Sequence, residues 1–141
     1  MNKIQTRTIG LIQIACTNNP KQNLLNAVDF IREAAKKGAQ IICLPELFLS
    51  SYFCQTENPE HFSLTEPIPG PTSNSLAILA KELETVLIVP LFEKRTEGIY
   101  HNSAVVIDAD GSLSGAYRKM HIPDDPCFYE KYYFTPGDNG F

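Results

Sequence analysis

The spacing of apolar residues in the first third of the chain predicts a strand, a helix and a second strand. Residues 8–16 are rich in Ile and Leu and contain no helix-capping signal, which favours a strand. Apolar residues then recur every three or four positions from Pro20 to residue 35, which predicts an amphipathic helix that ends at Gly38. A second apolar run at 39–44 follows directly. The short joints between these elements predict a parallel βαβ unit with a right-handed crossover.

The later part of the pattern predicts a helix and an antiparallel meander. Residues 49–71 are broken by prolines but contain aromatic residues, so we expect a long, packed loop there. The order of elements predicts a layered α/β protein with a mixed sheet, within one domain of 141 residues. The further expected elements are a helix at 72–84, strands at 85–92, 100–108 and 112–117, a charged hairpin loop at 93–98, a tight turn at 109–111 and a loop over 122–141.

Composition narrows the class of protein. The hydrophobic content of 43% and charged content of 20% are ordinary for a globular protein, and the net charge of −4 argues against nucleic acid or an anionic membrane as the main partner. The sequence has no apolar run near the roughly 20 residues that span a bilayer, and its amino terminus does not resemble a secretory signal. The four cysteines have no paired CxxC spacing, which predicts reduced thiols in a cytoplasmic protein rather than disulfides or a zinc site.

Glu46 is the first candidate for chemistry, because it directly follows an apolar strand. Leu44 and Pro45 precede it, and Leu47 and Phe48 follow it. Ligands of open α/β sheets bind at the carboxyl ends of strands. We expect Glu46 to be buried, and burial favours the neutral form of a carboxyl group, which suits a general base near neutral pH. The alternative is a solvated surface carboxylate.

Lys119 is the second candidate, because it lies at the end of the strand at 112–117, beside Arg118 and His121. A cation there can stabilise a developing oxyanion and pair with a carboxylate from a neighbouring strand end. A solvated basic patch is the alternative. Because side chains alternate along a strand, we expect Lys119 and Arg118 on opposite faces, with His121 nearer the side of Lys119. One of the two cations is then expected to point inward while the other meets solvent.

Glu130 is the third candidate. It lies in an aromatic-rich segment, residues 126–134, that can fold over a site and shield a buried acid. By itself this signal is weak, because many such segments only pack.

The cysteines and one polar triplet are less convincing as catalytic groups. Cys16 and Cys43 lie in expected core strands, where we interpret them as packing residues. Cys54 and Cys127 lie in loops, and neither is placed on a strand-to-helix elbow. The polar residues at 101–103 are successive on an expected strand, so they alternate between faces and do not converge.

Taken together, these residues resemble the nitrilase superfamily of carbon–nitrogen hydrolases over nearly the whole chain. The segment 44–48 is similar to the one that carries the catalytic glutamate of the family, which places that role on Glu46. The segment 117–121 is similar to the one that carries its lysine, Lys119, and Glu130 matches a second glutamate that supports this lysine. More specifically, three segments resemble the N-carbamoylputrescine amidase branch: residues 52–55, 120–124 and 130–138.

The resemblance implies an αββα sandwich, represented here by a mixed sheet with helices on one face, in a protein that usually forms homo-oligomers. It implies hydrolysis of an amide or ureido C–N bond through a cysteine thioester. Glu46 acts as general base, Lys119 stabilises the oxyanion and Glu130 supports the lysine. No metal or organic cofactor is implied, and the partner is a small-molecule amide or carbamoyl amine. For the branch named above, the products are putrescine, carbon dioxide and ammonia.

The sequence departs from the family pattern in two respects. The family nucleophile lies beyond the second glutamate, and none of the four cysteines matches it. We therefore expect residues 1–141 to be the amino-terminal part of a single carbon–nitrogen hydrolase domain that lacks the nucleophile-bearing remainder and is inactive alone. Cys127 stands where glycine is usual, which alters the loop if that position needs a positive φ.

Two other interpretations stay open. The chain can be a non-catalytic remnant or a half-domain that acts as an interaction module. It can also hydrolyse a substrate with Cys54 or Cys127 as a substitute nucleophile.

Overall fold

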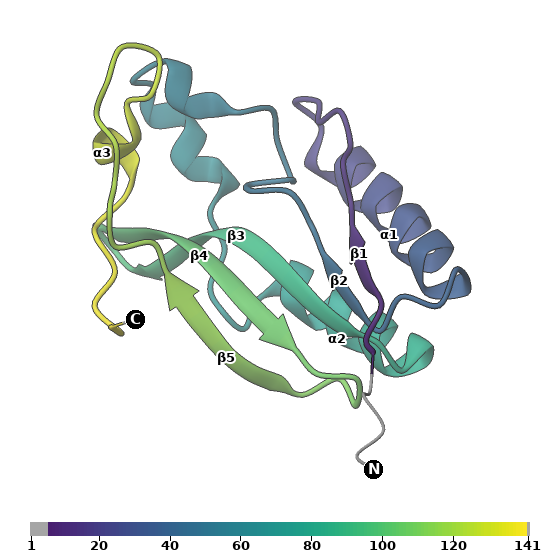
Figure 1. Ribbon diagram of the computed structural model, residues 1–141. Helices are drawn as coiled ribbons and strands as arrows, with labels where there is room; N and C mark the ends of the chain where they lie inside the picture. Colours follow the sequence, from purple (N-terminus) through teal and green to yellow (C-terminus); the bar gives the residue numbers. More distant parts are fainter. Residues whose placement is uncertain (1–5, 141) are drawn as a thin grey trace.

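The computed structural model describes residues 6–140, which form one mixed sheet with two long helices on one of its faces (Figure 1). Its elements are β1 (Ile9–Leu11), α1 (Pro20–Lys36), β2 (Ile41–Cys43), the 3-10 helices η1 (Phe53–Gln55) and η2 (Pro59–Leu64), α2 (Pro71–Leu83), β3 (Val86–Thr96), β4 (Ile99–Ile107), β5 (Leu113–Arg118) and α3 (Glu130–Tyr133). The first three strands are parallel, and β3, β4 and β5 are antiparallel, in chain order across the sheet. The predicted α/β class, with a parallel unit followed by a meander, is confirmed.

α1 begins and ends where local sequence signals predict. Asn19 is the N-cap, and its side-chain oxygen accepts a 3.2 Å hydrogen bond from the backbone N–H of Gln22. Pro20 occupies the first turn, where its missing N–H costs no helical hydrogen bond. Gly38 has a φ of +91°, a conformation that glycine adopts without steric cost and that ends the helix.

The main core lies between the sheet and its two long helices. Alternate side chains of the central strands point to this face, and they pack against the apolar sides of α1 and α2, which also contact each other. The buried members include Ala27, Ile31, Ile42, Leu76, Leu79, Leu87, Val89, Leu91, Val105 and Ile107. Both long helices therefore cover the same face, as predicted.

The opposite face of the sheet carries apolar side chains that neither α1 nor α2 covers. Cys43, Ile88 and Val106 are aligned across β2, β3 and β4, so they share this face. Asn102 lies four residues before Val106 on β4, which places it on the same face nearer the other end of the sheet. Any polar group that faces Asn102 must therefore lie on the side of the sheet away from α1 and α2.

β1 is much shorter than the strand predicted at 8–16. Ile12 still donates a 2.9 Å hydrogen bond to the carbonyl oxygen of Cys43, but ladder pairing ends there. The reason lies in β2, because Pro45 has no N–H to donate and Leu47 has a φ of +51° that turns the chain away. The residues after Leu11 therefore have no parallel partner, although their alternate side chains still pack on the core.

β3 is longer than predicted, and the expected hairpin loop at 93–98 is mostly strand. Pairing continues through Thr96, and the turn is reduced to Glu97 and Gly98. The charged residues at 93–98 favour a loop when only the sequence is considered. Glu93 is nevertheless buried in the sheet, because Arg118 and Ser103 form hydrogen bonds with its carboxylate. Tertiary pairing therefore overrides the local polarity of the segment.

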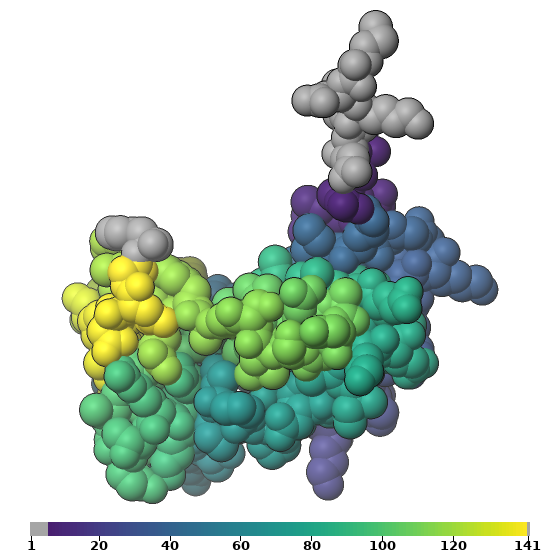
Figure 2. Space-filling model, turned by 90° about the horizontal axis from the view of Figure 1, so that it is seen from below, coloured from purple at the N-terminus to yellow at the C-terminus, as the bar shows by residue number. Residues whose placement is uncertain are grey.

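The long loop is packed, as its aromatic residues predicted, and it packs against the carboxyl-terminal segment. Phe53 stacks on Phe92 with ring centroids 5.2 Å apart, and the edge of Tyr133 meets Phe53 at 5.0 Å. Tyr133 belongs to α3, a short helix within the stretch expected to be all loop. Figure 2 shows this carboxyl-terminal part at one end of the molecule, away from α1 and β1. No helix in the described part of the chain is long and apolar enough to cross a membrane.

Candidate active site

Glu46 lies at the carboxyl end of β2, where the chain turns sharply. The following residue, Leu47, is buried in a left-handed conformation with a φ of +51°, and Phe48 is fully buried. These anchors hold the backbone on one side of Glu46, while its own side chain is 51% exposed. The predicted burial of Glu46 is therefore wrong: Pro45 and the turn carry the carboxylate past the end of the apolar strand, out of the core.

Lys119 follows β5 directly and reaches toward Glu46 over the sheet face that carries Asn102. Its backbone N–H donates a 2.8 Å hydrogen bond to the carbonyl oxygen of Asn102, which continues the pairing of β5 with β4. Its Nζ lies 3.2 Å from Oε1 of Glu46 and 2.8 Å from Oε2 of Glu130. Burial by itself lowers the pKa of Lys119, but the hydrogen bonds and negative charges of the two glutamates outweigh burial and raise it.

Glu130 is the buried acid of this cluster, at only 3% exposure. Both of its carboxylate oxygens are occupied, because Oε2 accepts from Lys119 and Oε1 accepts a 2.8 Å hydrogen bond from the hydroxyl of Tyr52. Burial first, and then the hydrogen bond to Glu130 and the negative charge of Glu130, raise the pKa of Tyr52. Tyr52 is a contact that the sequence patterns did not indicate, since nothing relates it to Glu130 except the packing of two distant loops.

Asn102 is a second residue of the site that the sequence interpretation missed. Its side-chain amide donates a 2.6 Å hydrogen bond to Oε1 of Glu46, the same oxygen that faces Lys119. Its neighbours His101 and Ser103 point to the opposite face, where Ser103 donates to Glu93. The expectation that the residues at 101–103 do not converge is therefore confirmed, but the alternation that separates them also placed Asn102 alone on the face of the site.

Arg118 and Lys119 lie on opposite faces as predicted, but neither simply meets solvent. Arg118 forms two hydrogen bonds to the buried carboxylate of Glu93, 2.7 Å from Nε and 2.6 Å from Nη2. Its side chain is less exposed than that of Lys119. The expectation of one solvated cation is wrong, because each cation has a carboxylate partner on its own face.

The four cysteines are all free thiols. Cys54 is completely buried, and burial together with the charge of Glu130 raises its pKa to about 12. Cys127 is exposed and has a φ of +68°, so the position does require the conformation that glycine adopts most easily. Cys16 and Cys43 are only partly buried rather than enclosed in the core.

The arrangement brings the three predicted site residues together from distant parts of the chain. A carboxylate open to solvent, a cation and a buried carboxylate lie in one row, and the cation bridges the two acids. Such a row can hold a proton acceptor beside a positive charge without any metal ligand. Among residues 6–140, no group of three or more His, Cys, Asp or Glu side chains is arranged to hold a metal ion.

Comparison with known proteins identifies the family. The family model described as carbon-nitrogen hydrolase matches residues 8–141. The chain belongs to the carbon–nitrogen hydrolase family. Its sheet, with two helices on one face, is the corresponding part of this fold: the crystal structure of a carbon–nitrogen hydrolase from Helicobacter pylori G27 superposes with a TM-score of 0.89 at 46% sequence identity, and the match covers 96% of this chain and 46% of that one.

Curated relatives of this chain include proteins named for their substrates. It is 47% identical over 135 residues to an N-carbamoylputrescine amidase of Solanum lycopersicum, covering 95% of this chain and 45% of the relative. It is 41% identical over 134 residues to a citrullinase of Francisella tularensis, covering 94% and 46% respectively. The chain therefore spans about half the length of the curated relatives it matches.

Proposed function

We propose that this chain is the part of a carbon–nitrogen hydrolase that supplies the proton-transfer and oxyanion-binding groups for hydrolysis of an amide or ureido bond through a cysteine thioester. The observation that supports this proposal is the position of Lys119 Nζ between Glu46 and Glu130. In the proposal Glu46 is the general base, Lys119 stabilises the oxyanion and Glu130 supports Lys119. These roles follow from the family resemblance, and the geometry is consistent with them.

The proposed reaction begins with a thiol that gives its proton to Glu46. The thiolate forms a bond to the carbonyl carbon, and the oxygen that becomes negative is stabilised by Lys119. The C–N bond then breaks, and the leaving amine takes the proton from Glu46. Water hydrolyses the thioester with Glu46 again as base, which regenerates the thiol.

We infer that the nucleophilic cysteine lies outside residues 1–141. A thiol is nucleophilic as the thiolate, and Cys54 does not supply one near neutral pH because its pKa is about 12. Cys127 is accessible but lies in a turn closed by Asp125 and Phe128, without a base in hydrogen-bond contact among the described residues. The substitute-nucleophile interpretation is therefore not favoured.

Asn102 has a positioning role in this proposal. Both described contacts of the Glu46 carboxylate, from Asn102 and from Lys119, are made to Oε1. Oε2 is then the oxygen left to accept the proton of the nucleophile. A carboxylate held at one oxygen loses less freedom in the transition state than one that rotates in solvent.

The finer assignment is a carbamoyl amine substrate, with N-carbamoylputrescine as the first choice. It is supported by the amidase and citrullinase relatives, since N-carbamoylputrescine and citrulline both end in a ureido group. The products are putrescine, carbon dioxide and ammonia, so the enzyme would act in polyamine biosynthesis. A cytoplasmic location and assembly into homo-oligomers remain predictions of the sequence.

The test uses the full-length gene product together with the 141-residue chain. We expect the full-length protein to release ammonia from N-carbamoylputrescine, and the 141-residue chain to release none. Glu46→Gln and Lys119→Met in the full-length protein should each lower kcat by at least about 100-fold. Absence of ammonia release from the full-length protein contradicts the substrate, and a fully active Glu46→Gln variant contradicts the base.

A non-catalytic interaction module is the second candidate function. The apolar, uncovered sheet face favours it, because exposed apolar surface of this kind usually marks an interface. Size-exclusion chromatography of the 141-residue chain should show self-association or aggregation. A well-behaved monomer together with an active full-length enzyme removes this candidate.

A further inference from the structure

Glu93 lies on the face of the sheet opposite the candidate active site, and its carboxylate binds two neighbouring strands at once. It accepts a 2.6 Å hydrogen bond from the hydroxyl of Ser103 on β4. It accepts two more from Arg118 at the end of β5, 2.7 Å from Nε and 2.6 Å from Nη2. Ser103 and Arg118 are paired in the β4–β5 ladder. The carboxylate of Glu93, which is only 3% exposed, therefore joins β3 to both of these strands.

The residues next to Ser103 and Arg118 are the two donors that hold Glu46. Asn102 precedes the serine, and Lys119 follows the arginine. The amide of Asn102 donates a 2.6 Å hydrogen bond to Oε1 of Glu46, and Nζ of Lys119 lies 3.2 Å from the same oxygen. Since successive side chains of a strand point to opposite faces, the same short stretch of β4 and β5 binds one acid on each face of the sheet.

Backbone pairing makes Glu93 a fixed point in the sheet. The N–H of Lys94 donates a 2.8 Å hydrogen bond to the carbonyl oxygen of Glu66, and the N–H of Glu66 donates a 3.1 Å hydrogen bond to the carbonyl oxygen of Phe92. On its other side, this part of β3 is paired with β4. Because the backbone of Glu93 is held from both sides, its carboxylate is a firm anchor for the side chains that bind it.

The backbone hydrogen bonds of Lys119 leave one motion of its side chain open. Its N–H donates to the carbonyl oxygen of Asn102, and its own carbonyl oxygen accepts a 2.9 Å hydrogen bond from the N–H of Gly137. These bonds hold the peptide groups, but a twist of the strand end about its axis still swings the side chains on both faces together. The two bonds from Arg118 to Glu93 oppose that twist. A misplacement of about 1 Å in an active site can lower a rate by about 100-fold.

We propose that Glu93 is a positioning residue of the candidate active site, which acts through Arg118 and Ser103 from the far face of the sheet. It sets the direction in which Lys119 and Asn102 reach the general base. The inference rests on the proposed function, because it takes Lys119 as the group that stabilises the oxyanion.

The test uses the full-length gene product and its Glu93→Gln variant, which keeps the size of the side chain and removes its charge. We expect kcat for ammonia release from N-carbamoylputrescine to fall about 10-fold to 100-fold, with KM changed less than about threefold. The two site glutamates raise the pKa of Lys119 in the unmodified chain, so looser contacts should lower it. The alkaline limb of the pH profile of kcat should then move to lower pH by at least about half a unit.

A loss of stability alone gives a different result. Partial unfolding lowers the apparent kcat through the fraction of active protein, but it leaves KM and the alkaline limb unchanged. All variants are therefore compared at a temperature where circular dichroism shows them to be folded. Arg118→Lys keeps a cation beside Glu93 and should retain more of kcat than Arg118→Met does. Because the two residues act as a unit, adding Glu93→Gln to Arg118→Met should lower kcat little further.

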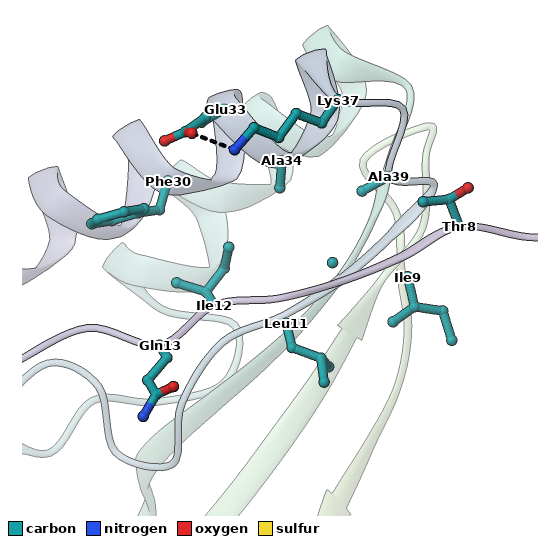
Figure 3. A pocket seen from close by; sticks show the side chains of 11 residues that line it. Thr8, Ile9, Leu11, Ile12, Gln13, Phe30, Glu33, Ala34, Lys37 and Ala39 are labelled. Atoms are coloured by element: carbon teal, nitrogen blue, oxygen red, sulfur yellow. Dashed lines mark hydrogen bonds and ion pairs between the residues drawn. The ribbon is translucent and has the colours of Figure 1, made fainter.

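Two exposed carboxylates serve as matched controls. Glu97, at the turn after β3, pairs with Lys94 at 2.6 Å. Glu33 pairs with Lys37 at 2.6 Å on α1, beside the pocket between α1 and β1 that Figure 3 shows. Glu97→Gln and Glu33→Gln remove the same charge as Glu93→Gln but touch neither β4 nor β5, so both should leave kcat and its alkaline limb unchanged.

Two results overturn the proposal. One is a folded Glu93→Gln variant with the kcat and the alkaline limb of the unmodified protein. The other is a lower kcat with an unmoved alkaline limb and no advantage of Arg118→Lys over Arg118→Met, which means that Glu93 only stabilises the fold. If Glu93→Gln does not fold, Ser103→Ala and Arg118→Lys decide, and an unmoved alkaline limb in both overturns the proposal.

A measurement without substrate separates this inference from the proposed function. If the unmodified full-length protein releases no ammonia, the proposed substrate fails, and the titration of Lys119 in that protein is followed by NMR of its ¹³C-labelled side chain. The titration midpoint should still be lower in Glu93→Gln than in the unmodified protein. Equal midpoints overturn the positioning role of Glu93.

Discussion

The side-chain amide of Asn102 donates a 2.6 Å hydrogen bond to the carboxylate of Glu46, although 56 residues separate them in the chain. Asn102 is held in the middle of a long antiparallel strand, whereas Glu46 lies on a turn with an exposed side chain. The hydrogen bond from the strand residue therefore orients the exposed carboxylate of Glu46. The same carboxylate oxygen also faces Lys119, so the direction of the Glu46 carboxylate is set by two donors.

Loss of this amide should weaken the proposed reaction without unfolding the protein. In the full-length enzyme we expect Asn102→Ala to lower kcat about 10-fold to 100-fold with a smaller change in KM, since a hydrogen bond to a charged group contributes about 1.5–3 kcal/mol. Steady-state ammonia release measures this, with Ser114→Ala on the exposed β5 as control. Unchanged kcat would show that Asn102 does not position Glu46.

The ion pair on the opposite face should matter for stability. Arg118→Ala leaves the buried carboxylate of Glu93 without its cation, and we expect the free energy of unfolding to fall by about 3–5 kcal/mol. Arg95→Ala removes an exposed ion pair with Asp138, which solvent screens, and should have little effect on stability. Urea unfolding of the 141-residue chain measures both. Equal effects of the two substitutions would contradict the importance of the burial of Glu93.

The same pair predicts how acid affects stability. Burial by itself raises the pKa of Glu93, but hydrogen bonds from Arg118 and Ser103 outweigh it and hold the pKa below its usual value. A carboxyl group with a lowered pKa stabilises the fold above the pKa of the unfolded chain, about 4.5, and this stabilisation is lost as pH falls through the folded pKa. Unfolding midpoints between pH 7 and 3 should therefore fall less for Glu93→Gln than for the unmodified chain. If the midpoints of the two proteins fall by the same amount between pH 7 and 3, the prediction for Glu93 is contradicted.

The buried thiol of Cys54 predicts how alkaline pH affects the stability of the fold. Its pKa is raised from 9.0 to about 12 by burial and by the charge of Glu130. The stabilisation is complete below the unfolded pKa near 9 and is lost as pH rises toward 12, because the unfolded thiol ionises first. We expect Cys54→Ala to flatten the decline of stability between pH 8 and 11, apart from its constant packing cost.

Iodoacetamide at pH 7 should also label the exposed Cys127 well before the buried Cys54.

Cys127 offers a stabilising substitution. Its φ of +68° costs a residue with a Cβ about 1–2 kcal/mol, and glycine avoids most of that cost. We expect Cys127→Gly to raise the free energy of unfolding by up to about 1 kcal/mol, since glycine also loses more backbone entropy on folding. Cys127→Ala keeps the Cβ and should change little. A destabilised glycine variant would mean that the cysteine side chain itself contributes to the loop.

Local patterns were sufficient for most of the elements and for the family, but not for the ends of β1 and β3 or for α3. The period of apolar residues and the cap at Asn19 located α1 to within a residue or two, because both depend on neighbours in the chain. The parallel unit and the meander followed from the joints between elements. The segments around Glu46, Lys119 and Glu130 indicated the family, and the structure brings these three side chains into contact.

Tertiary structure alone decided how those side chains are used. The sequence placed Glu46 after an apolar strand and so predicted burial, but the turn at Leu47 carries it outward, and Glu130 is the buried acid instead. Tyr52 and Asn102 enter the site only because distant strands and loops pack there. Burial and charge pairing depend on which surfaces meet across the sheet, and apolar periodicity records the face of a strand without recording its partner. The sequence by itself therefore determined most of the elements and pointed to Glu46, Lys119 and Glu130, and the packing of the sheet determined which acid is exposed, which is buried and which donor holds each one.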